Sequence, residues 1–502
     1  MSINIILGIL LLCCSALGQA AENNPAAGHG RIDPLRQIEH IVVIYAENRS
    51  FDNLYGLFPG ADGIAQASAA SRTQTDHDGK ALVHLPQVWN DQAGLFKEEI
   101  PNRPFRLDGA PFNLGLNIRT PDLVHRYYQH IEQINGGRLD RYAAMSDAGA
   151  LTMAHYDGAQ LPLWKYAKEF VLADHFFMGA FGGSFLNHFW LVCACTPTFA
   201  DAPDRLKVQL DGNGRLKRRM DSPASALDGP PSLHDNSLTP DGYAVNTMQP
   251  PYQPSGFPPA PGGDPRYVDP ARLPLPPQTF RTIGDTLSAR GISWAWYAEA
   301  WQAAQADGMQ PAQAPRSTIY GRQPGLPSLE AHHQPFNYFA RFAPDTAERQ
   351  EHLKDSAEFL AAIDAGTLPQ VSFYKPGSLF NEHSGYADVL TGDRHIAELI
   401  AHLQASRLWP TLAIIVAYDE NGGYWDHVAP PSGPGWSDRW GPGARIPALI
   451  ISPFAKKGFV DSTPYDTTSI VKFITRRFAL EPLPGVRRNA GDLGNAFSFP
   501  QE

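Results

Sequence analysis

Six continuous apolar runs constrain the fold of this chain more than any other feature of its sequence. Polar and apolar residues do not alternate within them, so each run is typical of a strand that is covered on both faces of a sheet. Helical patterns separate several of the runs, which indicates an α/β fold with a mostly parallel sheet flanked by helices. The runs span residues 40–46, 170–177, 291–298, 369–375, 412–419 and 446–452.

Three segments carry the clearest helical patterns, and they span residues 121–134, 393–406 and 466–478. The third begins with Asp466, whose side chain can accept hydrogen bonds from the free N–H groups of a first helical turn. We therefore expect a helix that starts directly after Asp466.

A proline-rich segment, residues 201–279, interrupts this alternation with stretches such as QPPYQPSGFPPAPGGDP. Proline has a fixed φ and no backbone N–H, so the segment should form neither helix nor sheet. Loops of this length are usually functional lids or poorly ordered. We predict a single domain over residues 21–502, with this insertion lying over its core.

The first residues resemble a secretion signal. Ile3–Leu17 forms an apolar core that is too short to span a membrane, and small residues follow as far as Ala20. We predict a signal peptide over residues 1–20 and a periplasmic or secreted bacterial protein. An uncleaved anchor and a lipoprotein modified at Cys13 or Cys14 are the alternatives, and no later segment looks transmembrane.

Charge and cysteine content narrow the possible partners and cross-links. The 502 residues carry a net charge of −10 without a run of lysine or arginine, which argues against nucleic-acid binding. Beyond the predicted signal, the cysteines are Cys193 and Cys195. A disulfide across one residue is strained, so we expect two buried thiols.

Two of the apolar runs end in acidic residues. Glu47 and Asn48 follow the first run, and Asp419 and Glu420 stand at the end of the fifth. Ligands of open α/β sheets gather beyond the carboxyl ends of strands, where these oxygens could converge on one divalent metal ion: Mg, Ca, Mn or Zn. Taken pair by pair, such acids are more often helix caps or solvated loop residues.

A serine follows two glycines at the predicted start of a helix. Gly182 and Gly183 precede Ser184, and free N–H groups at a helix N-terminus favour an anion such as phosphate. The G-x-S-x-G hydrolase motif is absent because Leu186 occupies the position of its second glycine. A metal could activate the Ser184 hydroxyl instead, and the alternative is a simple helix cap.

Several histidines form a third group of candidates: His125, His130, His332, His333 and His383. They could donate hydrogen bonds to phosphoryl oxygens. Imidazole is protonated below about pH 6.5, so a site that relies on imidazolium would bind phosphate better in acid. A histidine considered alone is more often a surface or core residue.

These features occur together in stretches that include HIVVIYAENRSFDNLYG, DLVHRYYQHIEQINGG, GGSFLNHFW, HHQPFNYF, FNEHSGYADVLTGDRHI and VAYDENGGYWDHVAPP. In their content and order the chain resembles the bacterial phosphoesterase family of secreted acid phosphatases and phosphatidylcholine-type phospholipases C. The resemblance implies an alkaline-phosphatase-like α/β core and a phosphoserine intermediate.

The resemblance also assigns roles to residues. It implies Ser184 as the nucleophile, with Glu47, Asn48, Asp419, Glu420 and Ser184 around one metal ion. It places His125, His333 and His383 near the phosphoryl group, and Asn48 and His332 in contact with substrate.

The details favour the acid phosphatase branch: a serine nucleophile, a signal without twin arginines, and an end soon after the last core helix. Small phosphorylated molecules are then the expected substrates. One alternative is a phospholipase C that takes phospholipid headgroups. The other is a non-catalytic secreted protein with a structural calcium ion, which a buried Ser184 or one distant from the acids would favour.

Overall fold

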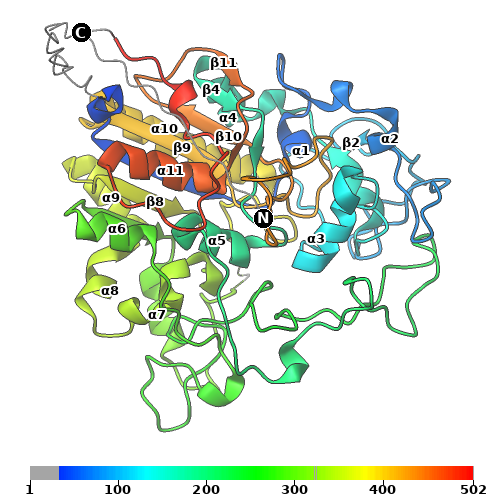
Figure 1. Ribbon diagram of the computed structural model, residues 1–502, viewed down its shortest axis with the longest axis horizontal. Coiled ribbons are helices and arrows are strands. Elements are labelled where there is room, and N and C mark those ends of the chain that lie inside the picture. The colour runs from blue at the N-terminus through cyan, green and yellow to red at the C-terminus, as the bar shows by residue number, and fades with distance from the viewer. Residues whose placement is uncertain (1–32, 322, 324, 501–502) are drawn as a thin grey trace, which may run out of the picture.

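The computed structural model describes residues 33–321, 323 and 325–500. Within that part of the chain, an eight-stranded sheet forms the centre, with the strand order β11-β4-β10-β9-β1-β8-β6-β7 (Figure 1). Its pairs are parallel except for those of β10 with β9 and with β4. The predicted α/β class with a mostly parallel sheet is confirmed.

Each of the six apolar runs contains a strand of this sheet. The run 170–177 is divided, because its last part forms β5 (Phe176–Phe177), which pairs with β12 (Tyr465–Asp466) outside the main sheet. The strands of the main sheet are β1 (His40–Ala46), β4 (Val171–Ala173), β6 (Trp294–Ala298), β7 (Leu353–Asp355), β8 (Val371–Lys375), β9 (Leu412–Tyr418), β10 (Ala448–Ile451) and β11 (Phe459–Asp461).

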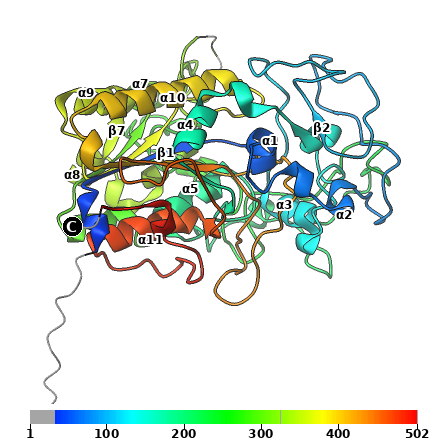
Figure 2. The same cartoon turned by 90° about the horizontal axis from the view of Figure 1, so that it is seen from above.

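Helices cover both faces of the sheet. Figure 2 shows α4 (Pro162–Glu169), α9 (Ser356–Ala365) and α10 (Val389–Ala405) over one face, with α5 (Ser184–Cys193) and α11 (Thr467–Phe478) over the other. This cover explains why β9 is apolar along its whole length and β1 is apolar after His40. The remaining helices and strands are α1 (Phe51–Tyr55), α2 (Ala69–Arg72), α3 (Tyr127–Ile134), α6 (Ile283–Ala289), α7 (Trp301–Gly308), α8 (Ala347–His352), β2 (Phe105–Arg106) and β3 (Ala154–His155).

Two of the three predicted helices agree closely with α10 and α11, and Asp466 caps α11 by accepting a hydrogen bond from Thr468 N. The prediction of a helix from residue 121 is wrong, because α3 begins only at Tyr127. The preceding segment is extended, and its N–H groups bind side chains: Val124 N donates to Asp147 Oδ1, and Tyr127 N donates to an asparagine of the proline-rich insertion.

Residues 201–279 contain two short 3-10 helices, Asp204–Leu206 and Pro270–Arg272, and isolated β-bridges, with no α-helix or named strand. In Figure 1 this segment runs as an extended green path outside the sheet. Side chains of the core bind its backbone, since Tyr338 OH donates to Met248 O at 2.7 Å. The insertion is therefore held to the core without an α-helix or named strand of its own.

Cys193 and Cys195 form a disulfide, so the expectation of two free thiols is wrong. Cys193 ends α5, and Ala194 has a φ of 47°, in the left-handed region. The chain reverses there and brings the two Cα atoms to 5.1 Å, within the usual range for a disulfide.

The predicted signal peptide, residues 1–20, lies outside the described residues. Among the helices that are described, none combines the length and the hydropathy needed to cross a bilayer.

Candidate active site

The acids predicted to converge do so because β1 and β9 are parallel neighbours. Their register places Ala46 beside Tyr418, so both strands end at the same level. The segments that follow remain in contact: Asp419 N donates to Ala46 O at 3.0 Å, and Asn48 N donates to Asp419 Oδ1 at 3.1 Å. The strand register thus brings together residues that are about 370 positions apart.

Glu47, Asn48, Asp419 and Glu420 are all buried, with exposed fractions of 1% or less. Among the described residues, Asp419 Oδ2 and Glu420 Oε1 have no hydrogen-bond partner. Buried carboxylate oxygens without partners are costly unless a cation neutralises them. The donor set, three carboxylates and an amide oxygen, fits a divalent metal ion.

Burial also disfavours the charged forms of these acids when no cation is present. It raises the pKa of Glu47 to about 8, although the Lys375 ammonium opposes the shift. Burial raises the pKa of Glu420 well above its usual value, and the neighbouring Asp419 charge adds to the shift. A bound cation would reverse these shifts, because it favours ionised ligands.

Ser184 is the first residue of α5, as its sequence context predicted. Its hydroxyl donates to Asn48 Oδ1 at 3.3 Å, and Asn48 N donates to Asp419. Asn48 therefore connects Ser184 to Asp419. Gly182 has a φ of 93°, and a Cβ atom there would lie 2.8 Å from Tyr127 N. Glycine at this position therefore lets the chain turn into α5 against the start of α3.

Three of the predicted histidines border the acids or the serine. His125 Nε2 lies 3.8 Å from Glu420 Oε1, and the rings of His125 and His383 lie 5.5 Å apart. His333 Nε2 contacts Glu47 Oε1 directly. The His125 side chain precedes α3 and is not part of it.

The pKa values of two of these histidines do not support an imidazolium in the free protein. Burial lowers the pKa of His333 well below its usual value, and the Lys375 ammonium adds to this shift. Burial and the neighbouring His125 lower the pKa of His383 in the same direction. Both shifts disfavour the charged imidazolium forms of these rings.

His332 lies at the mouth of the site beside His333, with their ring centres 4.5 Å apart. His130, the fifth predicted histidine, binds the chain just before Ser184. Its Nδ1 accepts a hydrogen bond from Gly182 N at 3.1 Å. It therefore steadies the turn that leads to Ser184.

Two residues of the site were not among the predictions. Lys375, at the end of β8, is 1% exposed and its Nζ lies 3.2 Å from Glu47 Oε1. The sequence showed only that Lys375 ends an apolar run, and the pairing of β8 with β1 in the structure places it beside Glu47. His188 lies one helical turn after Ser184, with Nδ1 3.8 Å from Asp419 Oδ2; only its i, i+4 spacing from Ser184 pointed to this.

A cavity of about 280 Å³ lies beside Ser184 and several of the histidines. Ser184, His125, His332 and His383 line it on the side of the core, and Asn246 of the insertion lines it as well. Ser184 is only 4% exposed, but it borders this cavity and is in contact with the acid cluster through Asn48.

The site combines a hydroxyl and imidazoles at a cavity with buried acids that Asn48 connects to the hydroxyl. Phosphoryl transfer requires these groups: a nucleophile, a place for a cation and hydrogen-bond donors. The model of the Phosphoesterase family matches residues 38–481, and the chain therefore belongs to this family. The family prediction made from the motifs is confirmed.

Curated relatives in several bacteria have the name phospholipase C. Phospholipase C A of Mycobacterium tuberculosis is 25% identical over 510 residues, which cover 95% of this chain and 79% of the relative. The non-hemolytic phospholipase C of Burkholderia pseudomallei is 25% identical over 505 residues, which cover 93% of this chain and 60% of the relative. The non-hemolytic phospholipase C of Pseudomonas aeruginosa is also 25% identical, over 520 residues, which cover 96% of this chain and 60% of the relative.

Solved structures have a lower sequence identity to this chain. A protein of the alkaline phosphatase superfamily from Vibrio parahaemolyticus is 10% identical, with a TM-score of 0.32 over 77% of this chain and 75% of that chain.

Proposed function

We propose that this phosphoesterase cleaves phospholipid headgroup esters in the manner of a phospholipase C, with Ser184 as the nucleophile. The observation that carries the proposal is the direct contact between the Ser184 hydroxyl and Asn48, whose own N–H binds Asp419. The names of the relatives support a lipid phosphodiester as substrate over the phosphate monoester that we expected from the sequence.

The reaction uses residues that already border the cavity. The N–H groups at the start of α5 bind the phosphate, and Ser184 Oγ attacks phosphorus opposite the leaving alcohol. The Oγ–P bond forms as the bond to the alcohol breaks. The Ser184 proton passes to water, and His125 supplies a proton to the leaving oxygen. Water then attacks the same phosphorus, which releases the phosphorylated headgroup and restores the Ser184 hydroxyl.

A divalent cation would be held by Glu47, Asn48, Asp419 and Glu420. When bound, it would stabilise the negative charge that develops on the phosphoryl oxygens. Lys375 and His333 orient Glu47 from the opposite side, since both contact its Oε1 atom.

A phosphate monoesterase is the second candidate, favoured by the small size of the cavity, about 280 Å³. Parallel assays with phosphatidylcholine vesicles and p-nitrophenyl phosphate separate the two. Release of phosphocholine with a kcat/KM above that for the monoester is the expected result. Turnover of the monoester with intact phosphatidylcholine would establish the second candidate instead.

A further inference from the structure

The segments that carry the acids stay paired well beyond the acids themselves. Ser50 Oγ donates to Trp425 O at 2.7 Å, and Asp52 N donates to Asp426 Oδ2 at 3.0 Å. In the other direction, His427 N donates to Asp52 Oδ2 at 2.8 Å. The segment after β1 therefore runs alongside the segment after β9 as far as His427.

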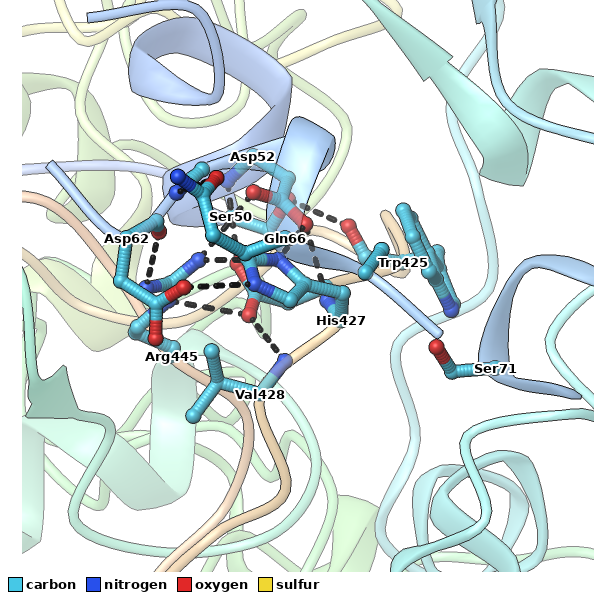
Figure 3. Close-up of polar contacts among 12 residues, drawn as sticks. Ser50, Asp52, Asp62, Gln66, Ser71, Trp425, His427, Val428 and Arg445 are labelled. Atoms are coloured by element: carbon cyan, nitrogen blue, oxygen red, sulfur yellow. Dashed lines mark hydrogen bonds and ion pairs between the residues drawn. The ribbon is translucent and has the colours of Figure 1, made fainter. Parts of the chain in front are cut away.

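This pairing ends in a buried group of four charged side chains, which we call the brace: Asp52, Asp426, His427 and Arg445. Figure 3 shows the side chains of Asp52, His427 and Arg445 pointing toward one another. Arg445 Nε donates to Asp426 Oδ1 at 3.0 Å, and its Nη2 donates to Asp52 Oδ1 at 3.1 Å. His427 Nδ1 lies 2.7 Å from Asp52 Oδ2, and its Nε2 lies 3.1 Å from Asp62 Oδ1.

The charges of the brace are matched without a metal ion. Asp52, Asp426 and Arg445 have exposed fractions of 1% or less, and the Arg445 guanidinium contacts both carboxylates. The environment also favours protonated His427, since hydrogen bonding to Asp52 and nearby carboxylates raise its pKa to about 9 against the effect of burial. The brace is an ion-pair network, in contrast to the acid cluster, which has unpartnered oxygens.

Arg445 also connects the two segments to a third part of the sheet. It precedes β10, the neighbour of β9, and its carbonyl accepts a hydrogen bond from Phe51 N at 3.1 Å. Its guanidinium stacks on the Phe51 ring, 4.2 Å from the ring centre. One side chain thus joins α1, the segment after β9 and the start of β10.

The acid cluster needs such a restraint. In the ionised forms that cation binding requires, Glu47, Asp419 and Glu420 are like charges in one buried space and repel one another. We propose that the brace is a positioning group for the metal site, which holds both acid-bearing segments together and thereby increases their affinity for the cation. This inference rests on the proposed function through the assignment of these acids as ligands.

The test compares two buried arginines. Arg445→Gln breaks the brace. Arg349→Gln is the matched control, because Arg349 is also buried, stacks on the Trp301 ring at 5.2 Å and donates to Asn337 Oδ1 at 2.7 Å. Arg349 lies in α8, which packs on β6 and β7 at the far edge of the sheet from β9.

Mg²⁺, Ca²⁺, Mn²⁺ and Zn²⁺ are titrated separately into chelator-treated protein by calorimetry, well below the melting temperatures of all variants. For the cation that the wild type binds most tightly, Arg445→Gln should raise the dissociation constant at least tenfold. Arg349→Gln should change it less than about twofold, even where it lowers the melting temperature as much.

Wild-type cation affinity in Arg445→Gln would overturn the proposal, as would an equal loss in Arg349→Gln. Should Arg445→Gln fail to fold, Asp426→Asn tests the same group. It removes one charge and one hydrogen-bond acceptor with almost no change of shape, and the same tenfold loss is expected. Asp419→Asn keeps the two proposals distinguishable. If Asp419→Asn abolishes cation binding and the brace variants do not weaken it, only the proposal about the brace is wrong. If the wild type binds none of the four cations, the proposal about the brace and the proposed metal-assisted function are both wrong.

Discussion

Asn48 connects the two halves of the candidate site at the scale of single residues. Its backbone N–H binds Asp419, while its side-chain oxygen accepts from Ser184. It has a positive φ of 61°, a conformation that asparagine adopts more readily than most residues. One backbone turn therefore orders the Ser184 hydroxyl and the Asp419 carboxylate relative to each other.

Replacement of Ser184 by alanine should lower kcat at least about a thousandfold, because no other group takes the place of the attacking oxygen. The melting temperature should change little, since the hydroxyl makes one hydrogen bond at the cavity. Ser452→Ala is the control: this buried serine donates to Leu412 O at the opposite end of β9, so its loss should affect stability and spare turnover. Near-normal turnover by Ser184→Ala would refute the nucleophile assignment.

Replacement of Asp419 by asparagine removes one negative charge from the acid cluster and leaves its shape almost unchanged. Metal content, measured by elemental analysis after dialysis, should fall together with turnover, each at least about tenfold. Unchanged metal content and activity would count against Asp419 as a ligand.

At the scale of elements, the position of Ser184 depends on the turn into α5. Gly182 lies between α5 and the segment that leads into α3, and both its positive φ and its lack of a side chain are needed there. His130, in α3, binds the N–H of Gly182 from the other side. Ser184 is thus placed by two helices that meet at one glycine.

Gly182→Ala should reduce both stability and turnover. The positive φ alone costs about 1 kcal/mol for alanine, and the approach of its Cβ to Tyr127 N, 2.8 Å, forces the start of α5 to move. Gly60→Ala isolates the first effect, because Gly60 has a φ of 84° and open space around its Cβ position. Urea denaturation and kinetics should show a larger stability loss, and a loss of kcat, only in Gly182→Ala. Equal behaviour of the two variants would show that α5 does not need this close approach.

At the scale of the whole molecule, the brace makes stability depend on pH. The pKa of His427 is raised from 6.5 to about 9, and the groups that face it are Asp52, Asp62, Asp426 and Arg445. A raised pKa means that protonated His427 stabilises the folded state fully below about pH 6.5 and that this contribution disappears as the pH rises through 9. Alkaline conditions should therefore weaken the connection between the two acid-bearing segments.

His427→Gln removes this titration. The difference in unfolding free energy between wild type and variant should reach its maximum, up to about 3 kcal/mol, near pH 6 and shrink toward zero by pH 10. Urea denaturation at intervals between pH 6 and 10 measures it. A difference that does not vary with pH would contradict a charged His427.

The sequence alone determined most of the architecture and the identity of the acids. A continuous apolar run indicates a strand that is buried on both faces. The strands could therefore be located without knowing which other strands they pair with. The ends of β1 and β9 predicted Glu47 and Asp419, because carboxyl ends of parallel strands meet at one edge of a sheet. Motif resemblance supplied the family and the candidate roles of Ser184 and the histidines.

The tertiary structure decided what depends on contacts between distant residues. The start of α3 follows from Asn246, 119 residues away, and the brace joins Asp52 to Arg445 across 393 residues. The left-handed turn at Ala194 allows the disulfide that the spacing of the cysteines argued against. Burial lowers the pKa values of His333 and His383. A pKa follows from the surroundings of a side chain, and local sequence does not contain those surroundings.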